Sequence, residues 1–279
     1  MGVPQGSILG PLLFLLYVND LPNASSVLSF IQFADDTSLF IKGKSLHDMS
    51  TLMNEQLTIV TEWLKINKLS LNISKTKYMI MTSRGKKYND NTCEILIDGK
   101  VIDCVSEFRF LGIVIDNYLT WKSHIAHVCN KVSKLIGIFF KTRKILDTDT
   151  LVMLYNTLVK PYFTYCIIIW GNSFKSYLHR VEVLQKKLLR ILTFSLYNAH
   201  TQPLFRRWKI MEFNQLYTYL SSVHIFKCIY HLLPNSFWDE FRLCKSTRNS
   251  HNQSIARNVF VKHRSVTVAT MYEIISPLK

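Results

Sequence analysis

The sequence predicts an α+β fold, in which an antiparallel sheet with helices is followed by an all-helical region. Three observations support this prediction. Apolar segments rich in β-forming residues, separated by turn residues, occupy much of residues 28–116. Between them, residues 46–66 carry apolar side chains at a three-four spacing, which is typical of an amphipathic helix lying on a sheet. From Trp121 onward, helical patterns follow one another.

The composition indicates a basic protein with a sizeable core. Of its 279 residues, 48% are hydrophobic and 19% are charged, which suits one large or two modest domains. Lys and Arg number 34 against 19 Asp and Glu, giving a formal net charge of +15. This excess indicates a polyanionic partner, nucleic acid first and an anionic membrane second. The six cysteines include no Cys-x-x-Cys pair, so we expect reduced thiols in an intracellular protein, in the cytoplasm or the nucleus.

The N-terminal segment predicts a loop followed by a helix. Two glycines and a proline in residues 2–7 favour a stiff turn whose backbone can approach a ligand closely. Ser7 or Gly10 can cap the helix, and residues 12–18 are expected to lie in the core. This apolar stretch is too short to span a bilayer, and no basic residue precedes it as in a signal peptide. We therefore expect no membrane partner.

Residues 28–41 are the most informative stretch. Two apolar arms flank residues 34–37, so we expect a hairpin with the adjacent carboxylates of Asp35 and Asp36 at its tip. Burying two like charges without a partner is costly, and a divalent cation such as Mg²⁺, or Mn²⁺ in its place, removes that cost. Asp is also a favoured turn residue, so a purely structural turn is the alternative.

Three later segments complete the predicted sheet region. Residues 75–81 predict a basic strand after the helix at 46–66. Residues 95–102 predict a hairpin, because Asp98-Gly99 between apolar arms suits a two-residue type I′ turn. Residues 108–116 predict a single strand, with Gly112 at a point of close approach.

The region after Trp121 predicts helices with one apolar and one basic side. We expect these helices near residues 121–139, 150–162 and 177–192. The basic residues that lie mostly off the apolar stripes include Lys131, Lys134, Arg180, Lys186, Lys187 and Arg190. A basic helix face is usually only a solvated surface.

The remaining residues, 201–279, are the hardest to interpret. A helix is expected at residues 214–233, and the tail from Lys245 shows no clear period. His224 and Cys228 are four residues apart, as metal ligands on a helix can be, with His231 three further on. No second cluster completes four ligands, so we expect helix packing rather than a zinc site.

Two motifs in combination point to a known family. The sequence Gly-Val-Pro-Gln-Gly-Ser-Ile-Leu-Gly-Pro-Leu at residues 2–12 is followed by Phe-Ala-Asp-Asp at residues 33–36. This pair of motifs resembles the reverse transcriptases of non-LTR retrotransposons. The resemblance implies an incomplete polymerase palm over residues 1–116, a helical thumb-like region over residues 117–200 and a helical or irregular extension over residues 201–279.

The resemblance also implies a role for each motif residue. Asp35 would be the main ligand of the catalytic metal and Asp36 the supporting one. Gln5 and Gly6 would line the floor beneath the template and the incoming nucleotide. Phe33 would pack near the primer end.

Further implied contacts come from the later strands and helices. Lys75 or Lys77 would lie near the phosphates of the nucleotide, although an exposed lysine on an edge strand is the plain alternative. Phe110, Leu111 and Gly112 would hold the primer strand, as part of a primer-gripping hairpin. Beside a palm, the basic faces of the helices indicate a thumb that follows nucleic-acid phosphates.

The implied function is RNA-directed DNA polymerase, with two metal ions in nucleotidyl transfer. Its partners would be an RNA template, a DNA primer, the RNA/DNA hybrid and deoxynucleoside triphosphates. In the family, the fingers and a palm strand with the first metal-binding aspartate precede the glycine loop, so we expect a truncated fragment that is inactive alone. The alternative is a non-catalytic, basic nucleic-acid-binding remnant of a decayed element. An unrelated α+β protein remains only if both motifs are coincidental.

Overall fold

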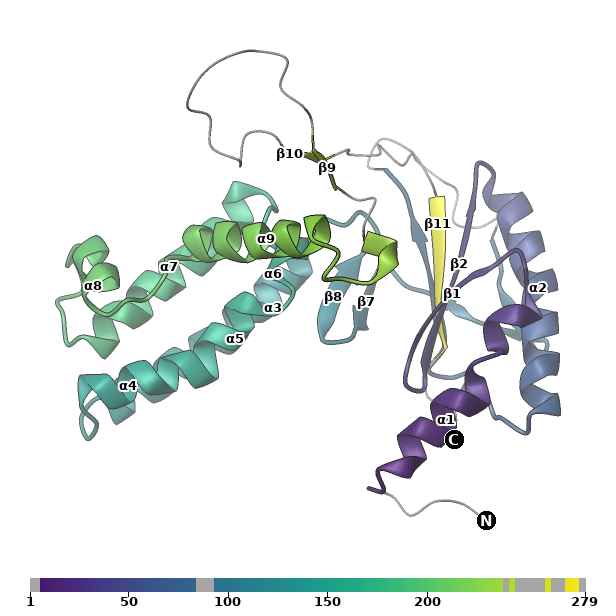
Figure 1. Ribbon diagram of the computed structural model, residues 1–279, viewed down its shortest axis with the longest axis horizontal. Coiled ribbons are helices and arrows are strands. Elements are labelled where there is room, and N and C mark those ends of the chain that lie inside the picture. The colour runs from purple at the N-terminus through teal and green to yellow at the C-terminus, as the bar shows by residue number, and fades with distance from the viewer. Residues whose placement is uncertain (1–5, 84–92, 238–240, 244–258, 262–268, 276–279) are drawn as a thin grey trace. The chain divides into compact units, whose positions relative to one another are not determined.

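The computed structural model describes residues 6–83, 93–237, 241–243, 259–261 and 269–275 (Figure 1). The chain divides into two compact units, residues 1–119 with 266–279 and residues 120–265. The first contains the main sheet and the second is largely helical, so the fold is α+β. The division into palm, thumb and extension stays a prediction.

The sheet of the first unit has five strands in the order β1-β2-β11-β3-β6. They are β1 (Ser29–Phe33), β2 (Asp36–Gly43), β11 (Ala269–Ile275), β3 (Lys77–Met81) and β6 (Asp103–Cys104). Neighbouring strands are antiparallel except β3 and β6, which are parallel. The last strand of the chain, yellow in Figure 1, therefore lies in the middle of the sheet.

Helix α2 (Leu46–Ile66) packs along one face of this sheet and has the predicted bounds (Figure 1). Ser45 caps it, since its Oγ atom accepts a hydrogen bond of 3.3 Å from the Asp48 N–H. The apolar stripe of the helix forms one core with the sheet, in which Met53 of α2 and Leu39 of β2 are fully buried. The predicted amphipathic helix is confirmed.

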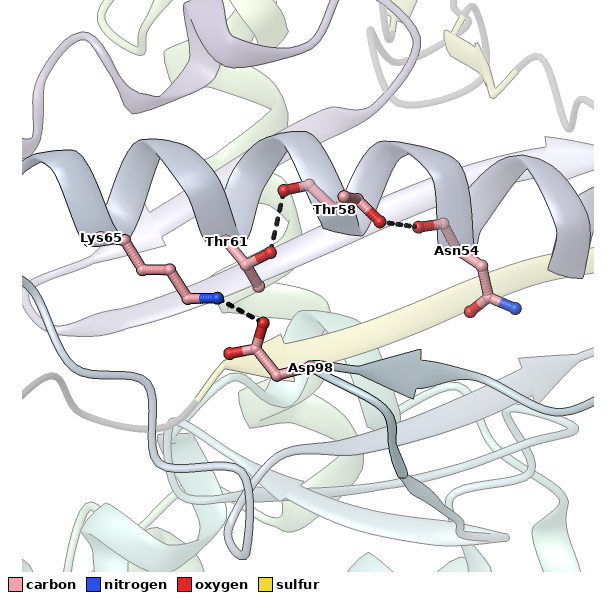
Figure 2. Close-up of polar contacts among 5 residues, drawn as sticks. All are labelled: Asn54, Thr58, Thr61, Lys65 and Asp98. Carbon is pink, nitrogen blue, oxygen red and sulfur yellow. Dashed lines mark hydrogen bonds and ion pairs between the residues drawn. The ribbon is translucent and has the colours of Figure 1, made fainter.

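The small hairpin of β4 (Leu96–Ile97) and β5 (Lys100–Val101) is tied to α2. Its turn residues Asp98 and Gly99 have φ angles of 48° and 74°, and a type I′ turn requires positive φ at both positions. Figure 2 shows Asp98 reaching the Lys65 ammonium of α2, with an N–O distance of 2.6 Å. The predicted hairpin is confirmed.

The predicted single strand at residues 108–116 is wrong. The structure has a hairpin there, β7 (Glu107–Phe110) and β8 (Ile113–Asp116). Leu111 and Gly112 form its turn with φ angles of 45° and 87°. Glycine adopts such angles freely but leucine rarely does, so Gly112 was the only local turn signal.

Helix α1 (Leu9–Val18) forms where a helix was expected, but its predicted burial is wrong. The Gly10 N–H donates to the Ser7 Oγ atom at 3.0 Å, which supports the start of the helix. The side chains of Leu12 and Leu16 are 54% and 66% exposed, and in α1 only Val18 is buried. Nearly every residue of α1 is apolar, so the sequence defines no polar face and does not show which side packs inward. A short 3-10 helix, η1 (Leu21–Ala24), follows.

The second unit is built of helices around Trp170. Its elements are α3 (Lys122–Thr142), α4 (Thr148–Leu154), the π-helical η3 (Tyr155–Val159), α5 (Lys160–Thr164), α6 (Ile167–Trp170), α7 (Lys175–Leu192), α8 (Thr201–Arg207), α9 (Phe213–Ile229), the 3-10 helix η4 (Asn235–Phe237) and the strand pair β9 (Phe241–Leu243) and β10 (Val259–Val261). The fully buried Trp170 ring stacks on Phe213 at 5.4 Å and meets His124 edge-on at 5.3 Å between centroids. The predicted helix at 214–233 ends earlier, at Ile229. Within the described ranges, no helix is both long and apolar enough to cross a bilayer.

Candidate metal site and nucleic-acid contacts

The candidate metal site lies at the turn between β1 and β2. Phe33 pairs with Asp36 across this hairpin, which leaves Ala34 and Asp35 as the two turn residues. Ala34 has a φ of 52°, a left-handed value that a tight hairpin turn demands. The two carboxylates are therefore adjacent at the tip, as predicted, and both residues are half-buried.

The two carboxylates disfavour each other's charge. Partial burial, and then the charge of Asp35, raise the pKa of the Asp36 carboxyl above its ordinary value. A divalent cation would favour the ionised form and reverse this effect. Among the described residues, neither carboxylate has an ion-pair partner, and no three Asp, Glu, His or Cys side chains gather as metal ligands. Asp35 and Asp36 thus fit part of a metal site.

The stem of this hairpin is buried while its tip is open. Thr37 and Ser38 of β2 are buried directly after Asp36. Phe33, which precedes the turn, is 58% exposed. The buried residues of β2 therefore hold the hairpin in place just below its tip, and the Phe33 ring beside the tip is accessible to solvent. The implied contact of Phe33 with a primer stays a prediction.

The glycine loop before α1 is described only from Gly6, and Gln5 lies outside the described residues. Gly6 has a φ of 90°, which an L side chain rarely adopts, and no atom lies within 4 Å of the position of a Cβ. The backbone conformation, rather than close packing, therefore requires glycine at this position. The implied contact of this loop with a template stays a prediction.

The two candidate lysines differ in their surroundings. The Lys77 ammonium forms an ion pair with Asp103 of β6. Lys75 is exposed just before β3 and has no ion-pair partner in the described part of the chain. Since β3 lies between β11 and β6, the edge-strand alternative does not hold for Lys77. The implied contact of either lysine with the phosphates of a nucleotide stays a prediction.

The hairpins β1–β2 and β7–β8 line one apolar cavity of about 210 Å³. Ile31 and Phe40 contribute to it from the first hairpin, and Phe108 and Phe110 from the second. The structure thus brings Phe110 close to the stem of the hairpin that carries the two carboxylates. The family resemblance implied a hairpin at residues 107–116, whereas the local sequence pattern did not. Primer binding by Phe110, Leu111 and Gly112 stays a prediction.

The basic side chains of the second unit lie largely on helix surfaces. Four of the predicted phosphate contacts are exposed, namely Lys131, Lys134, Arg180 and Lys187. Lys186 and Arg190 are half-buried, and the Arg190 Nε–H donates to the Ala199 carbonyl at 2.9 Å, so this arginine is partly engaged inside the fold. Lys141 is also exposed, and its seven-residue spacing from Lys134 places both on the same side of α3.

His224 and Cys228 take part in contacts inside the second unit. The His224 Nε2 and Cys228 Sγ atoms are 3.6 Å apart, and the His224 ring meets Phe237 edge-on. These contacts are those of residues that pack a helix against its neighbours.

Comparison with known proteins decides the family of the first part of the chain. Residues 1–115 match the family described as "Reverse transcriptase (RNA-dependent DNA polymerase)". This segment belongs to the reverse transcriptase family. It contains both motifs that carried the resemblance, the glycine loop and the Asp-Asp hairpin. We refer to residues 1–115 as the reverse transcriptase segment.

Curated relatives extend the similarity beyond this segment. The "RNA-directed DNA polymerase from mobile element jockey" of Drosophila funebris is 27% identical over 200 residues, which are 68% of this chain and 21% of that protein. The "Probable RNA-directed DNA polymerase from transposon BS" of Drosophila melanogaster is 30% identical over 202 residues, 69% of this chain and 22% of that protein. A "Retrovirus-related Pol polyprotein from type-1 retrotransposable element R1 2" of Nasonia vitripennis is 29% identical over 187 residues, 62% and 44% of the two chains.

These relatives confirm the resemblance to non-LTR retrotransposon enzymes. Their aligned regions are longer than 115 residues, so the similarity continues into the helical part of this chain. The chain spans between 21% and 25% of the length of the first four relatives. No solved structure gives a significant match.

Proposed function

We propose that the reverse transcriptase segment forms part of the active site of an RNA-directed DNA polymerase. The observation that carries this proposal is the pair of half-buried, adjacent carboxylates at a hairpin tip, in a segment that matches this family. The partners are then an RNA template, a DNA primer, their hybrid and deoxynucleoside triphosphates. The proposal includes an intracellular location, in the cytoplasm or the nucleus, because the six scattered cysteines of the sequence contain no Cys-x-x-Cys pair and indicate no disulfide framework.

Each residue of the site has a distinct task in this proposal. Mg²⁺ or Mn²⁺ held by Asp35 and Asp36 supplies charge that favours an ionised primer hydroxyl and stabilises the phosphoryl group. Asp36 is fixed by its pairing with Phe33 in the hairpin, whereas Asp35 lies in the turn. The exposed Phe33 ring offers a surface on which a primer base can stack. Lys75 supplies a positive charge for the phosphates of the nucleotide.

We also propose that these 279 residues do not extend a primer on their own. Transfer by two metals uses carboxylates that bridge both ions. Asp35 and Asp36 supply only part of such a set, and the described residues contain no cluster of three ligands. A further aspartate from another polypeptide segment is therefore required for activity.

The same observation favours a second candidate function. An incomplete ligand set suits a basic nucleic-acid-binding remnant in which the Asp-Asp hairpin no longer works. The exposed basic residues of α3 and α7 would then still bind nucleic acid. The two candidates differ in whether the hairpin binds a metal ion.

Mn²⁺ binding to the purified chain, measured by electron paramagnetic resonance, tests the metal site. We expect weak binding that Asp35→Asn reduces more than Asp36→Asn, because the family uses the first carboxylate as its main ligand. Asp98→Asn removes the same charge from the turn between β4 and β5 and serves as the control. Equal Mn²⁺ binding in the wild type and all three variants would reject the metal site and leave the non-catalytic remnant.

A further inference from the structure

A small cavity lies in the second unit where the chain passes from α8 to α9, both green in Figure 1. Its volume is about 250 Å³, and residues of both helices and of the link between them line it. Pockets for drug-sized ligands hold about 300–1,000 Å³, so this cavity suits a smaller group such as one nucleotide. We call it the α8–α9 pocket. The described residues that line it include none of the Asp-Asp hairpin and none of the predicted phosphate contacts.

The floor of the α8–α9 pocket belongs to the helical core. Phe205 of α8 and Ile210 of the link are buried in the core around Trp170. Helix α8 ends in a tight reversal, in which the Ile210 N–H donates to the Phe205 carbonyl at 3.0 Å and Lys209 has a φ of 52°. Such a bond with a left-handed residue is typical of a helix C-terminus. The reversal therefore fixes the backbone that carries Arg206 and Lys209.

The other side of the pocket is held by a buried glutamine. Gln185 of α7 donates from Nε2 to the Met211 carbonyl at 2.9 Å, and its Oε1 accepts from the Phe213 N–H at 2.9 Å. At the start of α9, the Glu212 carboxylate accepts the N–H of Gln215 in a capping box. The link is therefore anchored before any ligand binds, which lowers the entropic cost of binding.

The protein uses only some of the polar groups in the pocket. Arg206 and Lys209 are exposed, and neither has an ion-pair partner in the described part of the chain. The Glu212 carboxylate is engaged in the cap and also accepts from the Gln202 Nε2 atom at 3.4 Å. Among the described residues, the Oε1 of Gln202 and the Nε2 of Gln215 have no hydrogen-bond partner. The pocket thus offers two cations, one amide donor and one amide acceptor.

This set of groups matches one nucleotide. Phosphate accepts two parallel hydrogen bonds from an arginine and attracts a lysine as a point charge. The edge of a nucleobase carries donors and acceptors that side-chain amides can pair with, and its flat face packs on apolar side chains. A phosphorylated side chain would use the two cations but leave the amide groups without partners. A base within a duplex is already paired and stacked, so only an unpaired base can enter a pocket.

We propose that the α8–α9 pocket binds one unpaired nucleotide of an RNA strand. The phosphate meets Arg206 and Lys209, and the base lies over the apolar floor with its edge against Gln202 and Gln215. This site goes beyond the proposed polymerase function, because the predicted phosphate contacts on α3 and α7 read no base. The choice of RNA as the strand rests on the proposed function, whereas the nucleotide pocket does not.

Fluorescence anisotropy with a labelled single-stranded RNA of about eight nucleotides tests the pocket, using the full 279-residue chain in metal-free buffer. Arg206→Ala should weaken RNA binding about tenfold, because it removes hydrogen bonds to a charged phosphate. Arg207→Ala is the matched control. It removes the same charge from the next residue, whose guanidinium lies 5.8 Å from the centre of the Trp208 ring and which is not among the residues that line the pocket. This control should weaken RNA binding less than about twofold.

A second variant tests the base contact without changing the charge. Gln202→Leu removes the amide acceptor at an exposed position. It should weaken binding of the single-stranded RNA several-fold and leave the dependence of affinity on salt unchanged, since no phosphate contact is lost. Binding of a duplex of the same sequence should not respond to Gln202→Leu.

Two results would overturn the pocket. One is equal weakening of RNA binding by Arg206→Ala and Arg207→Ala, which would show that only net charge matters. The other is an equal effect of Arg206→Ala on the single strand and on the duplex, since a duplex offers no unpaired base.

Two further ligands test the source of the nucleotide. If adenosine monophosphate competes at the same concentration as the RNA, the pocket takes a free nucleotide and the strand is overturned. If single-stranded DNA of the same sequence binds as tightly and depends equally on Arg206, the choice of RNA is overturned.

The test of the pocket and the test of the proposed metal site can fail separately. RNA binding without metal depends on Arg206, and Mn²⁺ binding depends on Asp35. If Arg206→Ala leaves RNA binding unchanged while Asp35→Asn reduces Mn²⁺ binding, the pocket is rejected and the metal site stands. The opposite pair of results keeps the pocket and rejects the metal site.

Discussion

The β1–β2 hairpin concentrates two carboxylates in two consecutive residues, whereas the basic side chains of the second unit are spread over α3 and α7, helices of 21 and 18 residues. A metal site depends on the positions of a few atoms, and a displacement of about 1 Å can cost two orders of magnitude in rate. Phosphate binding depends on the number of cations that reach the backbone, and their contributions add. Single substitutions should therefore act steeply in the first region and gradually in the second.

The largest expected effect concerns primer extension by a fusion protein. A fingers and first-palm-strand segment from the jockey polymerase of Drosophila funebris is joined before Gly2. We expect this fusion to extend a primer on an RNA template with Mg²⁺, and Asp35→Asn to reduce extension at least about 100-fold. Single-turnover extension rates measure the loss.

Three controls accompany this experiment. Asp98→Asn in the fusion should leave the extension rate unchanged, because Asp98 lies in the turn between β4 and β5, where it pairs with Lys65 of α2. The 279-residue chain without the added segment should be inactive. Extension by the unfused chain, or a fusion that tolerates Asp35→Asn, would contradict the steep dependence expected of the hairpin.

The second effect is a graded loss of duplex binding. If about six basic side chains contact phosphates, the log–log plot of affinity against salt should have a slope of about −5 for B-form DNA. Changing Lys186 and Lys187 together to Ala should make that slope shallower by about 1 to 2, since each contact contributes about 0.9. Lys100→Ala in β5 is the matched control and should not change it. If the affinity did not depend on salt, the basic residues of α3 and α7 would not contact phosphates, and the thumb assignment would be rejected.

A third, smaller effect distinguishes the two lysines near β3. In the fusion, Lys75→Ala should raise the KM for nucleotide several-fold, because its charge is free to meet a phosphate. Lys77→Ala should affect KM less, since its ammonium is already paired with Asp103. Steady-state kinetics with varied nucleotide measure both. A larger KM effect for Lys77→Ala would show that its ion pair opens when nucleotide binds.

The smallest effect is a shift in the titration of Asp36. The charge of Asp35 helps to raise the pKa of the Asp36 carboxyl, so Asp35→Asn should lower that pKa toward its ordinary value. When the pKa of a carboxyl is higher in the folded than in the unfolded chain, the folded protein loses stability as the pH rises from the unfolded to the folded pKa value. The Asp35→Asn variant should lose less stability over this pH range, because the pKa of its Asp36 carboxyl is raised less. Carbon-13 NMR titration of Asp36 in metal-free buffer measures the shift. If the pKa of Asp36 did not change in Asp35→Asn, burial alone would cause the raised pKa.

Local sequence signals were sufficient for part of the fold and of the site. The period of residues 46–66 gave α2 with its bounds, and Asp98-Gly99 gave the turn between β4 and β5. The apolar arms around Asp35 and Asp36 gave the hairpin that carries both carboxylates. In each case, the residues that decide the structure are neighbours in sequence.

The features that could not be predicted depend on distant partners. The pairing of β11 joins residues 269–275 to strands more than 180 positions earlier, and no local period in the tail encodes it. The turn at Leu111 places a leucine at positive φ, against its own preference. The ion pair of Lys77 depends on Asp103, which lies on a strand of only two residues.

Helix α1 also affects the fate of the chain in a cell. Its ten residues are almost all apolar, and most of their side chains face water. Chaperones that hold unfolded proteins, and the proteases that act with them, select such exposed apolar segments. Chaperones and proteases can act on α1 for as long as it stays exposed. The two hydrophobic cores, against α2 and around Trp170, do not bury it. A surface that covers α1 should therefore protect this protein from degradation.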